Sequence, residues 1–397
     1  QIRLTKFQIV AHIFSCSENK VTKILLCFIL TLTRLFIYGK THENGRGLCL
    51  GENKMYTRKN LLGLMSGAAL AVVAAGAAVA QEVTLKLEHF LPAGANVPVE
   101  ILDVWADNLE RNSNGRIKIE RYATMSLGGT PPELIDHVQD GIVDIGWVVV
   151  GYTPGRYPTT EVFELPFMVE DADAASYALW KMHERHMKDG ETKDLKMLGT
   201  WVHGPGMFHT ADPVETPADL EGMKIRGGSR LVNDLLTRVG ATPVGMPVPA
   251  VAEALSKGVI DGTTIPWEVS AALKVPELVE NHTQFEGPAL YTLTFFLAMN
   301  KAKFDSLPAD IQEMIDDHSG LMFSIFAGST QQDADWQARA VAEEMGNNII
   351  TVSDTSKWRE LVNPIYDTWI ADMNAKGKDG QALIDEERAL MAEYSAD

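Results

Sequence analysis

The sequence predicts an α/β protein whose chain is divided between two lobes. Segments that alternate apolar and polar residues, as half-buried strands do, take turns with segments whose apolar residues recur at helical spacing. The stretch 81–397 also exceeds the usual size of a single hydrophobic core. No low-complexity linker separates two halves, so we expect lobes that share chain crossings. Alternation of strands and helices further predicts mainly parallel sheets.

The first elements can be placed from periodicity and from their end signals. A period of two predicts a strand, a period near 3.6 predicts a helix, and Gly or Pro marks the ends. Asn114-Gly115 stops the first helix, and Pro131 suits the first turn of the second. We expect strand, helix, strand, helix and strand, in that order, at 83–88, 97–112, 116–122, 131–139 and 142–150.

A weak internal repeat links two distant segments. The sequence of 138–146 parallels that of 255–262. In each segment a helix ends, a glycine follows (Gly141 or Gly258), and an apolar strand begins around an aspartate (Asp144 or Asp261). Glycine supplies the left-handed cap that lets the chain turn from helix to strand. A common helix-to-strand junction would also explain the repeat, but we favour two similarly built lobes, each with a strand that ends at a shared cleft.

From Leu307 to about Gly346 the helical pattern continues for an unusual length. Pro308 suits a first helical turn, and Ser306 is a candidate cap. We expect one long helix or two abutting helices, placed to brace both lobes.

The first 80 residues differ from the rest. Met55 is followed by a basic segment, then by an apolar Ala/Gly-rich stretch, and then by Ala78-Val79-Ala80, which are the parts of a secretory signal peptide. We expect export to the periplasm with cleavage near Ala80, and treat 55–80 as the signal peptide. We interpret 1–54 as probable spurious upstream translation; a genuine membrane-anchoring leader is the alternative.

Composition excludes several function classes. All three cysteines lie within 1–54, so the mature chain has no thiol for a disulfide, a nucleophile or a metal site. Removing the 10 basic and 3 acidic residues of 1–80 from the totals leaves 25 basic and 50 acidic residues, a net charge of −25. Such a chain repels nucleic acid and anionic lipid, so we expect neither as a partner. A site for an anion must be locally basic.

The most informative stretch runs from Thr216 to Asp261. It opens with Thr-Pro-Ala-Asp-Leu, reaches Lys224-Ile225-Arg226, continues through Gly240-Ala-Thr-Pro-Val, and ends in Ala254-Leu-Ser-Lys-Gly-Val-Ile-Asp-Gly. This order places Arg226 at the end of a short apolar strand between two helical segments. A guanidinium is always charged and offers a planar fork of donors that matches a carboxylate. The arrangement suits binding a carboxylate rather than performing a reaction.

These three motifs, in this order and spacing, resemble the periplasmic solute-binding subunit of TRAP transporters, the DctP-like family. The resemblance covers roughly 83–390. It implies a two-lobed periplasmic binding protein fold with a cleft between the lobes and a long bracing helix. It also implies chain crossings near 203, 290 and 331, hence lobe I at 83–203 and 291–331 and lobe II at 204–290 and 332–390. The implied partners are the small and large TRAP membrane subunits, with no insertion of the mature chain into the membrane and with no cofactor or metal.

The resemblance also identifies candidate ligand contacts. An Arg at the position of Arg226 binds the ligand carboxylate in the family, and His89 would face the same cleft. From the sequence we add aromatic residues that could form walls and polar residues that could form hydrogen bonds with a ligand. The alternative for each aromatic residue is packing in the core, for His89 and Glu268 an exposed loop position, and for Ser229 a helix cap. The predicted ligand-binding residues are Arg226, Trp267, Phe208, Tyr152, His89, Ser229 and Glu268.

Two departures from the family pattern bear on specificity. Many members have a second Arg where we align Gly206, and a polar Asn where Ile265 precedes Pro266. Both departures disfavour sialic acid and C4-dicarboxylates. We expect a small monocarboxylate with an apolar or aromatic body.

Two other functions stay open at this point. A sensory receptor could present its ligand from the same cleft to a signalling protein. A periplasmic enzyme is the third possibility, but His183 and His186 lack the spacing of a zinc protease motif, Gly204-Pro-Gly lacks the third glycine of a dinucleotide loop, and the chain has no Gly-x-Ser-x-Gly elbow. We therefore expect a binding protein and no catalytic residues.

Overall fold

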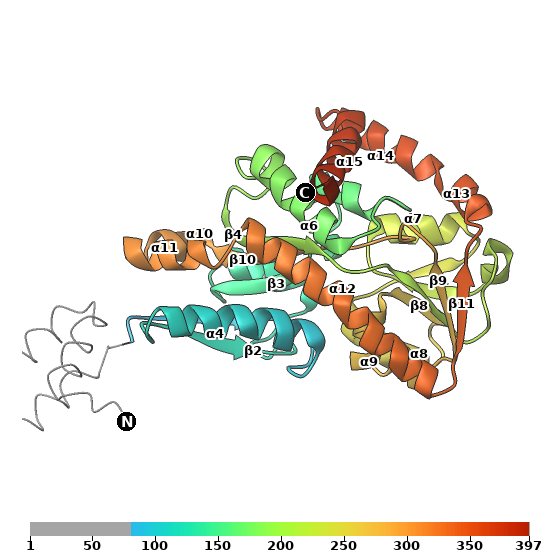
Figure 1. Cartoon of the computed structure of the whole chain (residues 1–397), viewed down its shortest axis with the longest axis horizontal. Coiled ribbons are helices and arrows are strands. Elements are labelled where there is room, and N and C mark those ends of the chain that lie inside the picture. Colours follow the sequence, from blue (N-terminus) through green and yellow to red (C-terminus); the bar gives the residue numbers. More distant parts are fainter. Residues whose placement is uncertain (1–80, 397) are drawn as a thin grey trace, which may run out of the picture. The chain divides into compact units, whose positions relative to one another are not determined.

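The computed structural model describes residues 81–396 (Figure 1). The expected leader segments 1–54 and 55–80 lie outside the described residues. Within 81–396, none of the helices combines the length and the apolar character that crossing a membrane requires.

Two β-sheets organise the described chain. The first sheet has the order β2-β1-β3-β10-β4 and consists of β1 Val83–Glu88, β2 Ile117–Tyr122, β3 Ile145–Val149, β4 Leu195–Val202 and β10 Thr294–Asn300. The second has the order β11-β9-β5-β8-β6-β7 and consists of β5 Met207–Thr210, β6 Lys224–Gly227, β7 Thr242–Gly245, β8 Gly262–Ile265, β9 Asn281–Phe285 and β11 Asn348–Val352. The α/β class and the division into two lobes are confirmed.

The two sheets follow the same plan. Read from β7, the second sheet repeats the first, with β7-β6-β8-β5-β9 in the places of β2-β1-β3-β10-β4. In each sheet one strand runs antiparallel to its neighbours, β10 in the first and β5 in the second. All the other strand pairs are parallel, as expected. Each reversed strand comes directly after the chain has crossed from the other sheet, which brings it in from the opposite end.

The weak internal repeat in the sequence corresponds to two equivalent backbone clamps. The carboxylate of Asp144 accepts a hydrogen bond from the backbone N–H of Lys86 (2.8 Å), and the backbone N–H of Asp144 donates to the carbonyl of Lys86 (3.1 Å). Asp261 makes the same pair of bonds with Lys224, both at 2.8 Å. Each Asp thus ties the strand after the short helix to a neighbouring parallel strand, β1 in the first sheet and β6 in the second.

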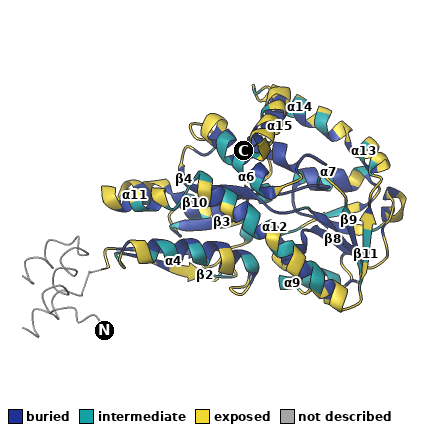
Figure 2. Cartoon of the chain, viewed as in Figure 1, coloured by how far each residue is buried: buried dark blue, intermediate teal, exposed yellow. Residues whose placement is uncertain are grey.

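Helices cover the sheets. They are α4 Asp103–Asn112, α5 Leu134–Gln139, α6 Ala172–Met182, α7 Arg230–Arg238, α8 Val251–Ser256, α9 Trp267–Ala272, α10 Lys301–Asp305, α11 Ala309–Asp317, α12 Leu321–Glu344, α13 Ser356–Val362, α14 Pro364–Ala375 and α15 Gly380–Ala396. Figure 2 shows the strands largely buried and the helices exposed along their outer faces.

The early elements fall where periodicity places them. The strand at 83–88 is confirmed, and the helix at 97–112 is formed by the short η1 (Val97–Leu102) and α4 together. The strand expected at 142–150 begins only at Ile145. Residues 140–144 instead form the turn, since Gly141 adopts a left-handed φ of 71° before Asp144 joins the clamp.

The long C-terminal helical pattern is two helices. Gly320, with a φ of 86°, separates α11 from α12. Helix α12 packs against α6 and β4 beside the first sheet and against α9 beside the second, so it braces both lobes (Figure 1). Gly328 permits this close approach, because a Cβ there would lie 2.2 Å from Oγ of Ser176 in α6.

The final helix packs beside the first sheet. Helix α15 lies against α6 and against η4 (Pro158–Glu164), whereas α13 and α14 contact α7. The assignment of all of 332–390 to the second lobe stays a prediction.

Candidate ligand-binding site

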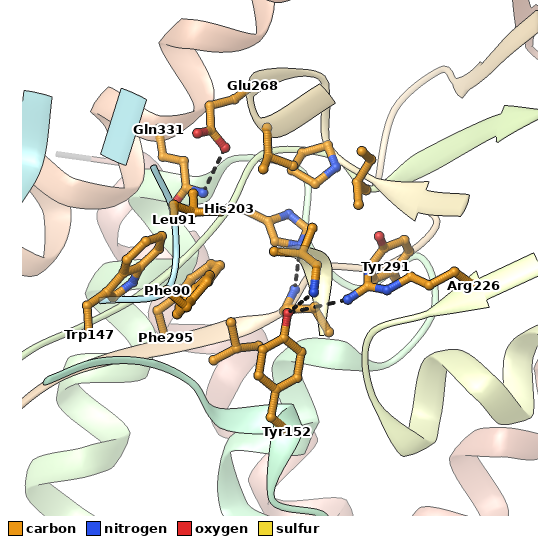
Figure 3. Close-up of a pocket in the computed structure, with 16 residues that line it drawn as sticks. Phe90, Leu91, Trp147, Tyr152, His203, Arg226, Glu268, Tyr291, Phe295 and Gln331 are labelled. Atoms are coloured by element: carbon orange, nitrogen blue, oxygen red, sulfur yellow. Dashed lines mark hydrogen bonds between the residues drawn. The ribbon is translucent and has the colours of Figure 1, made fainter. Parts of the chain in front are cut away.

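A cavity lies between the two sheets, with about 390 Å³ of empty space that includes open solvent. The residues that line it from the first sheet and its loops are Phe90, Leu91, Trp147, Val149, Tyr152, Leu293 and Phe295. Those from the second sheet and its loops are Arg226, Val248, Ile265, Pro266, Glu268 and Val269, while His203 and Tyr291 come from the chain crossings and Gln331 from α12. Residues from both sheets, from two chain crossings and from α12 therefore line one cavity (Figure 3).

Arg226 is the only Lys or Arg among these lining residues. It lies in β6, which pairs with β7 and β8 on either side, and only 1% of it is exposed. Its Nε donates to the carbonyl of Met246 (2.9 Å), its Nη1 to the carbonyl of Thr264 (3.0 Å), and its Nη2 reaches the hydroxyl of Tyr152 (3.4 Å). These bonds hold the guanidinium in one orientation.

No carboxylate among residues 81–396 forms an ion pair with this guanidinium. A guanidinium carries five N–H donors, and the three bonds of Arg226 leave one donor on each terminal nitrogen. A buried cation without a counter-charge is costly, and two free N–H groups on adjacent nitrogens match a carboxylate. The arrangement is suited to an anionic guest.

Tyr152 adds a further polar group beside Arg226. Its hydroxyl oxygen accepts a hydrogen bond from the backbone N–H of Val248 (2.8 Å) and faces Nη2 of Arg226. Both neighbours supply protons to the oxygen, so the hydroxyl hydrogen itself is left to donate elsewhere. Burial raises the pKa of Tyr152, so the hydroxyl keeps that hydrogen at neutral pH.

His203 contributes no positive charge. The backbone N–H of Leu293 donates to its Nε2 (3.0 Å), so Nδ1 carries the proton and donates to the carbonyl of Gly204. Burial, with the nearby charge of Arg226, lowers the pKa of His203 to about 4. Arg226 is therefore the one cationic group lining the cavity at neutral pH.

The rest of the wall is mainly aromatic. Phe90 stacks on Trp147 with ring centroids 4.4 Å apart, and Phe295 lies 5.6 Å from Trp147. The edge of Phe90 also meets Tyr152 at 6.1 Å. The indole N–H of Trp147 is buried without a hydrogen-bond partner. Such walls favour a flat apolar body, which gains from burial and from ring-to-ring contact.

Gly206 makes room for Tyr291 in this wall. A Cβ at position 206 would lie 2.3 Å from the ring of Tyr291, and the backbone N–H of Gly206 donates to the carbonyl of Tyr291 (3.0 Å). Any side chain at 206, an arginine included, would displace the tyrosine ring. Tyr291 thus occupies the space that a second basic side chain at position 206 would need.

Glu268 lies on the other side of the cavity from Arg226 (Figure 3). Its Oε2 accepts a hydrogen bond from the amide of Gln331 (3.1 Å), and its Oε1 is buried without a partner. Burial raises the pKa of Glu268 to about 7. The cavity thus has a cation at one end and a carboxyl group of intermediate acidity at the other.

Residues 88–372 match the model of bacterial extracellular solute-binding protein family 7, DctP. The chain belongs to this family. The members are receptors that bind solutes, and the two-sheet fold with a central cavity agrees with that role.

Solved structures of other DctP-type proteins are similar over nearly their whole length. A TRAP solute binding protein from Rhodoferax ferrireducens T118, crystallised with copurified benzoate, is 45% identical, with coverage of 79% of this chain and 99% of that chain and a TM-score of 0.77. A marine metagenome TRAP solute binding protein specific for aromatic acid ligands, co-crystallised with 3-hydroxybenzoate, is 42% identical with the same coverage and TM-score.

Among relatives found by sequence, the C4-dicarboxylate-binding periplasmic protein DctP of Rhodobacter capsulatus is 24% identical over 79% of this chain and 94% of its own length.

Three of the seven residues predicted to bind ligand line the cavity of this DctP-family protein: Arg226, Tyr152 and Glu268. The other four lie elsewhere. Phe208 is fully buried against Phe285 and Trp358 in the core of the second sheet. Trp267 lines a separate groove and donates to Gln284 (3.2 Å).

His89 and Ser229 also lie outside the cavity lining. His89 is buried beside Trp147, with ring centroids 6.4 Å apart, and it is the next residue, Phe90, that faces the cavity. Ser229 caps α7 by accepting a hydrogen bond from the backbone N–H of Val232 (3.3 Å). A helix cap was the alternative to a ligand contact that the sequence left open for this serine.

Several wall residues of the DctP-family site were not predicted, among them Trp147, His203, Tyr291, Phe295 and Gln331. Trp147 and Phe295 lie in β3 and β10, in which every residue is buried. Such strands carry no alternation that would tell one face from the other. A usable signal existed for Tyr291 and His203, since both lie at the expected chain crossings.

The arrangement can bind and enclose an acid. Within residues 81–396, no cluster of three or more His, Cys, Asp or Glu side chains could hold a metal ion. A small aromatic carboxylate fits each element of the cavity: the guanidinium, the free hydroxyl hydrogen and the aromatic walls.

Proposed function

We propose that this protein is an extracytoplasmic receptor for a small aromatic monocarboxylate, which it delivers to a TRAP membrane transporter. The observation that carries the proposal is the buried guanidinium of Arg226, which has no carboxylate partner among the described residues and lies in an aromatic cavity between two sheets.

Because the cavity lining has a single cation, we expect the ligand to carry a single carboxylate. His203 is neutral, and position 206 has no space for a second arginine. A dicarboxylate would place its second charge in an apolar wall, at a cost of several kcal/mol. The aromatic walls favour a ring over an aliphatic chain, and burying a ring with about 150 Å² of apolar surface contributes roughly 4 kcal/mol.

The relatives support the same ligand class. The two solved structures with 45% and 42% identity hold benzoate and 3-hydroxybenzoate, whereas the C4-dicarboxylate-binding relative is only 24% identical. Benzoate is therefore the reference ligand we would test first.

The test is calorimetric titration of the purified protein, freed of bound ligand by unfolding and refolding. Benzoate should bind more tightly than cyclohexanecarboxylate, succinate or N-acetylneuraminate. Arg226→Ala should weaken benzoate binding at least 100-fold, or about 3 kcal/mol, because a desolvated carboxylate is left unpaired. Arg238→Ala, at a partly exposed arginine of α7 paired with Asp234, is the matched control and should change nothing. Stronger binding of succinate or sialic acid would overturn the specificity, and binding that survives Arg226→Ala would overturn the site.

Delivery to the transporter requires export and membrane partners. The signal-peptide pattern at 55–80 and the family of extracellular binding proteins support a periplasmic location. The proposed partners are the small and large TRAP subunits. Uptake of labelled benzoate by cells expressing those subunits should depend on this protein.

Turnover of the ligand is not part of the proposed function. Benzoate incubated with stoichiometric protein should be recovered unchanged by chromatography. Appearance of any product would make the protein an enzyme.

A further inference from the structure

One oxygen of Glu268 has no hydrogen-bond partner inside the cavity. Only 3% of this residue is exposed, and Oε1 is buried and unpartnered, whereas Oε2 accepts from Gln331. The backbone N–H of Glu268 donates to Asp335 (2.7 Å), which holds the start of α9 against α12. An unpaired buried oxygen costs about 1–3 kcal/mol unless another molecule supplies its partner.

The orientation of this carboxyl group is set by a chain of hydrogen bonds. The indole N–H of Trp201 donates to Oε1 of Gln331 (2.9 Å), so the amide nitrogen of Gln331 must face Glu268. Gln331 can therefore satisfy one oxygen of Glu268 and no more. The second oxygen is left without a hydrogen-bond partner among the described residues.

We propose that Glu268 binds a hydroxyl group on the ring of the ligand, at the end of the cavity away from Arg226. This inference rests on the proposed function, because it requires the carboxylate of an aromatic acid to be held by Arg226. The ring then directs its other end away from the guanidinium, and Figure 3 shows Glu268 beside Gln331, on the other side of the cavity from Arg226.

The carboxyl group of Glu268 favours a hydroxyl over other substituents on the ligand ring. A hydroxyl donates to Glu268 when the carboxyl group is ionised and accepts from it when the carboxyl group is protonated. A second carboxylate pairs only with the protonated form, and an ammonium only with the ionised form. Asp335 is the other carboxyl group in contact with Glu268; it accepts from the backbone N–H of Glu268 and lines a separate groove. The hydroxyl alone suits both protonation states.

The ligand series that tests this inference is benzoate with its 2-, 3- and 4-hydroxy derivatives, measured by calorimetric titration. The 3- or the 4-isomer, whichever reaches Oε1, should bind about 10-fold more tightly than benzoate. The 2-isomer is the internal control. Its hydroxyl lies next to the carboxylate, at the Arg226 end, and should bring no gain from Glu268.

The protein variants separate recognition from folding. Glu268→Leu should lose the 10-fold preference, measured as the ratio of the variant's own affinities for the hydroxy acid and for benzoate. Glu268→Gln should keep part of the preference, because its amide group can still accept from Gln331 and donate to a hydroxyl. Glu184→Leu, at an exposed position of the helical segment after α6, should keep all of it.

The outcomes distinguish this inference from the function on which it rests. If benzoate binds and depends on Arg226 but no hydroxy isomer exceeds it, or if the preference survives Glu268→Leu, the role of Glu268 is wrong and the receptor function stands. If none of the four acids binds, the proposed function fails, and the inference fails with it.

Discussion

The hydroxyl of Tyr152 lies 3.4 Å from Nη2 of Arg226 and 2.8 Å from the backbone nitrogen of Val248. One side chain that follows β3 of the first sheet thereby contacts two segments of the second. The same oxygen carries the hydrogen that we expect a ligand carboxylate to accept. The ligand site and the contact between the sheets share this atom.

Tyr152→Phe should weaken benzoate binding about 10-fold. The change removes one donor to the carboxylate and leaves the N–H of Val248 without its acceptor. Calorimetry measures the affinity. Tyr122→Phe, which removes a hydroxyl bonded only to Glu120, is the control and should bind like the wild type. Equal affinities for the two variants would show that the hydroxyl of Tyr152 does not contact the ligand.

Gly206→Ala should reduce affinity by pushing Tyr291 into the cavity. The added Cβ would meet the tyrosine ring at 2.3 Å, and a fully buried ring can move only toward the open volume. We expect at least a 10-fold loss of benzoate binding and a destabilisation of about 1–3 kcal/mol. Gly94→Ala is the control, since no atom lies within 4 Å of its Cβ. Unchanged affinity of Gly206→Ala would mean that Tyr291 does not shape the ligand space.

Glu164→Gln should stabilise the protein at alkaline pH. Burial raises the pKa of Glu164 to about 8, and Glu161, which is paired with Arg230, adds repulsion. The folded protein therefore binds a proton between about pH 4.5 and 8 that the unfolded chain has lost, so the free energy of unfolding falls as pH rises through that window. The variant should exceed the wild type by on the order of 3 kcal/mol at pH 8.5, with the gap closing by pH 4.5.

Urea unfolding of both proteins at several pH values measures this difference. Other buried carboxyl groups, Glu268 among them, titrate alike in both proteins and cancel. A gap that is constant with pH would contradict the buried, neutral state of Glu164.

The two aspartate clamps should contribute similar stability. Asp144→Ala and Asp261→Ala each leave a backbone N–H without its carboxylate acceptor, at a cost of about 1–2 kcal/mol. The two sites lie in different sheets, so the double variant should show the sum. Asp140→Ala, exposed and next to the first clamp, is the control in chemical denaturation. A clear difference between the two single variants would argue that the lobes are not equivalent in this respect.

The amino-acid sequence by itself determined the local elements and singled out Arg226 as the proposed anion-binding residue. Strand β1, the helix at 131–139 and the turns at Gly141 and Gly258 follow from periodicity, Pro and left-handed Gly, which act over a few residues. Arg226 stands out because a permanent cation at the end of an apolar strand needs an anionic partner. That requirement can be inferred without knowledge of the fold.

Only the tertiary structure decided which aromatic residues surround the ligand space. Phe208 packs into the core and Trp147 faces the cavity, although both lie in fully buried strands. The direction of each side chain depends on what lies on both faces of its sheet, which is set by contacts between distant segments. The place of Gln331, on the helix that spans both sheets and in contact with Glu268, is likewise a consequence of packing between residues 63 positions apart.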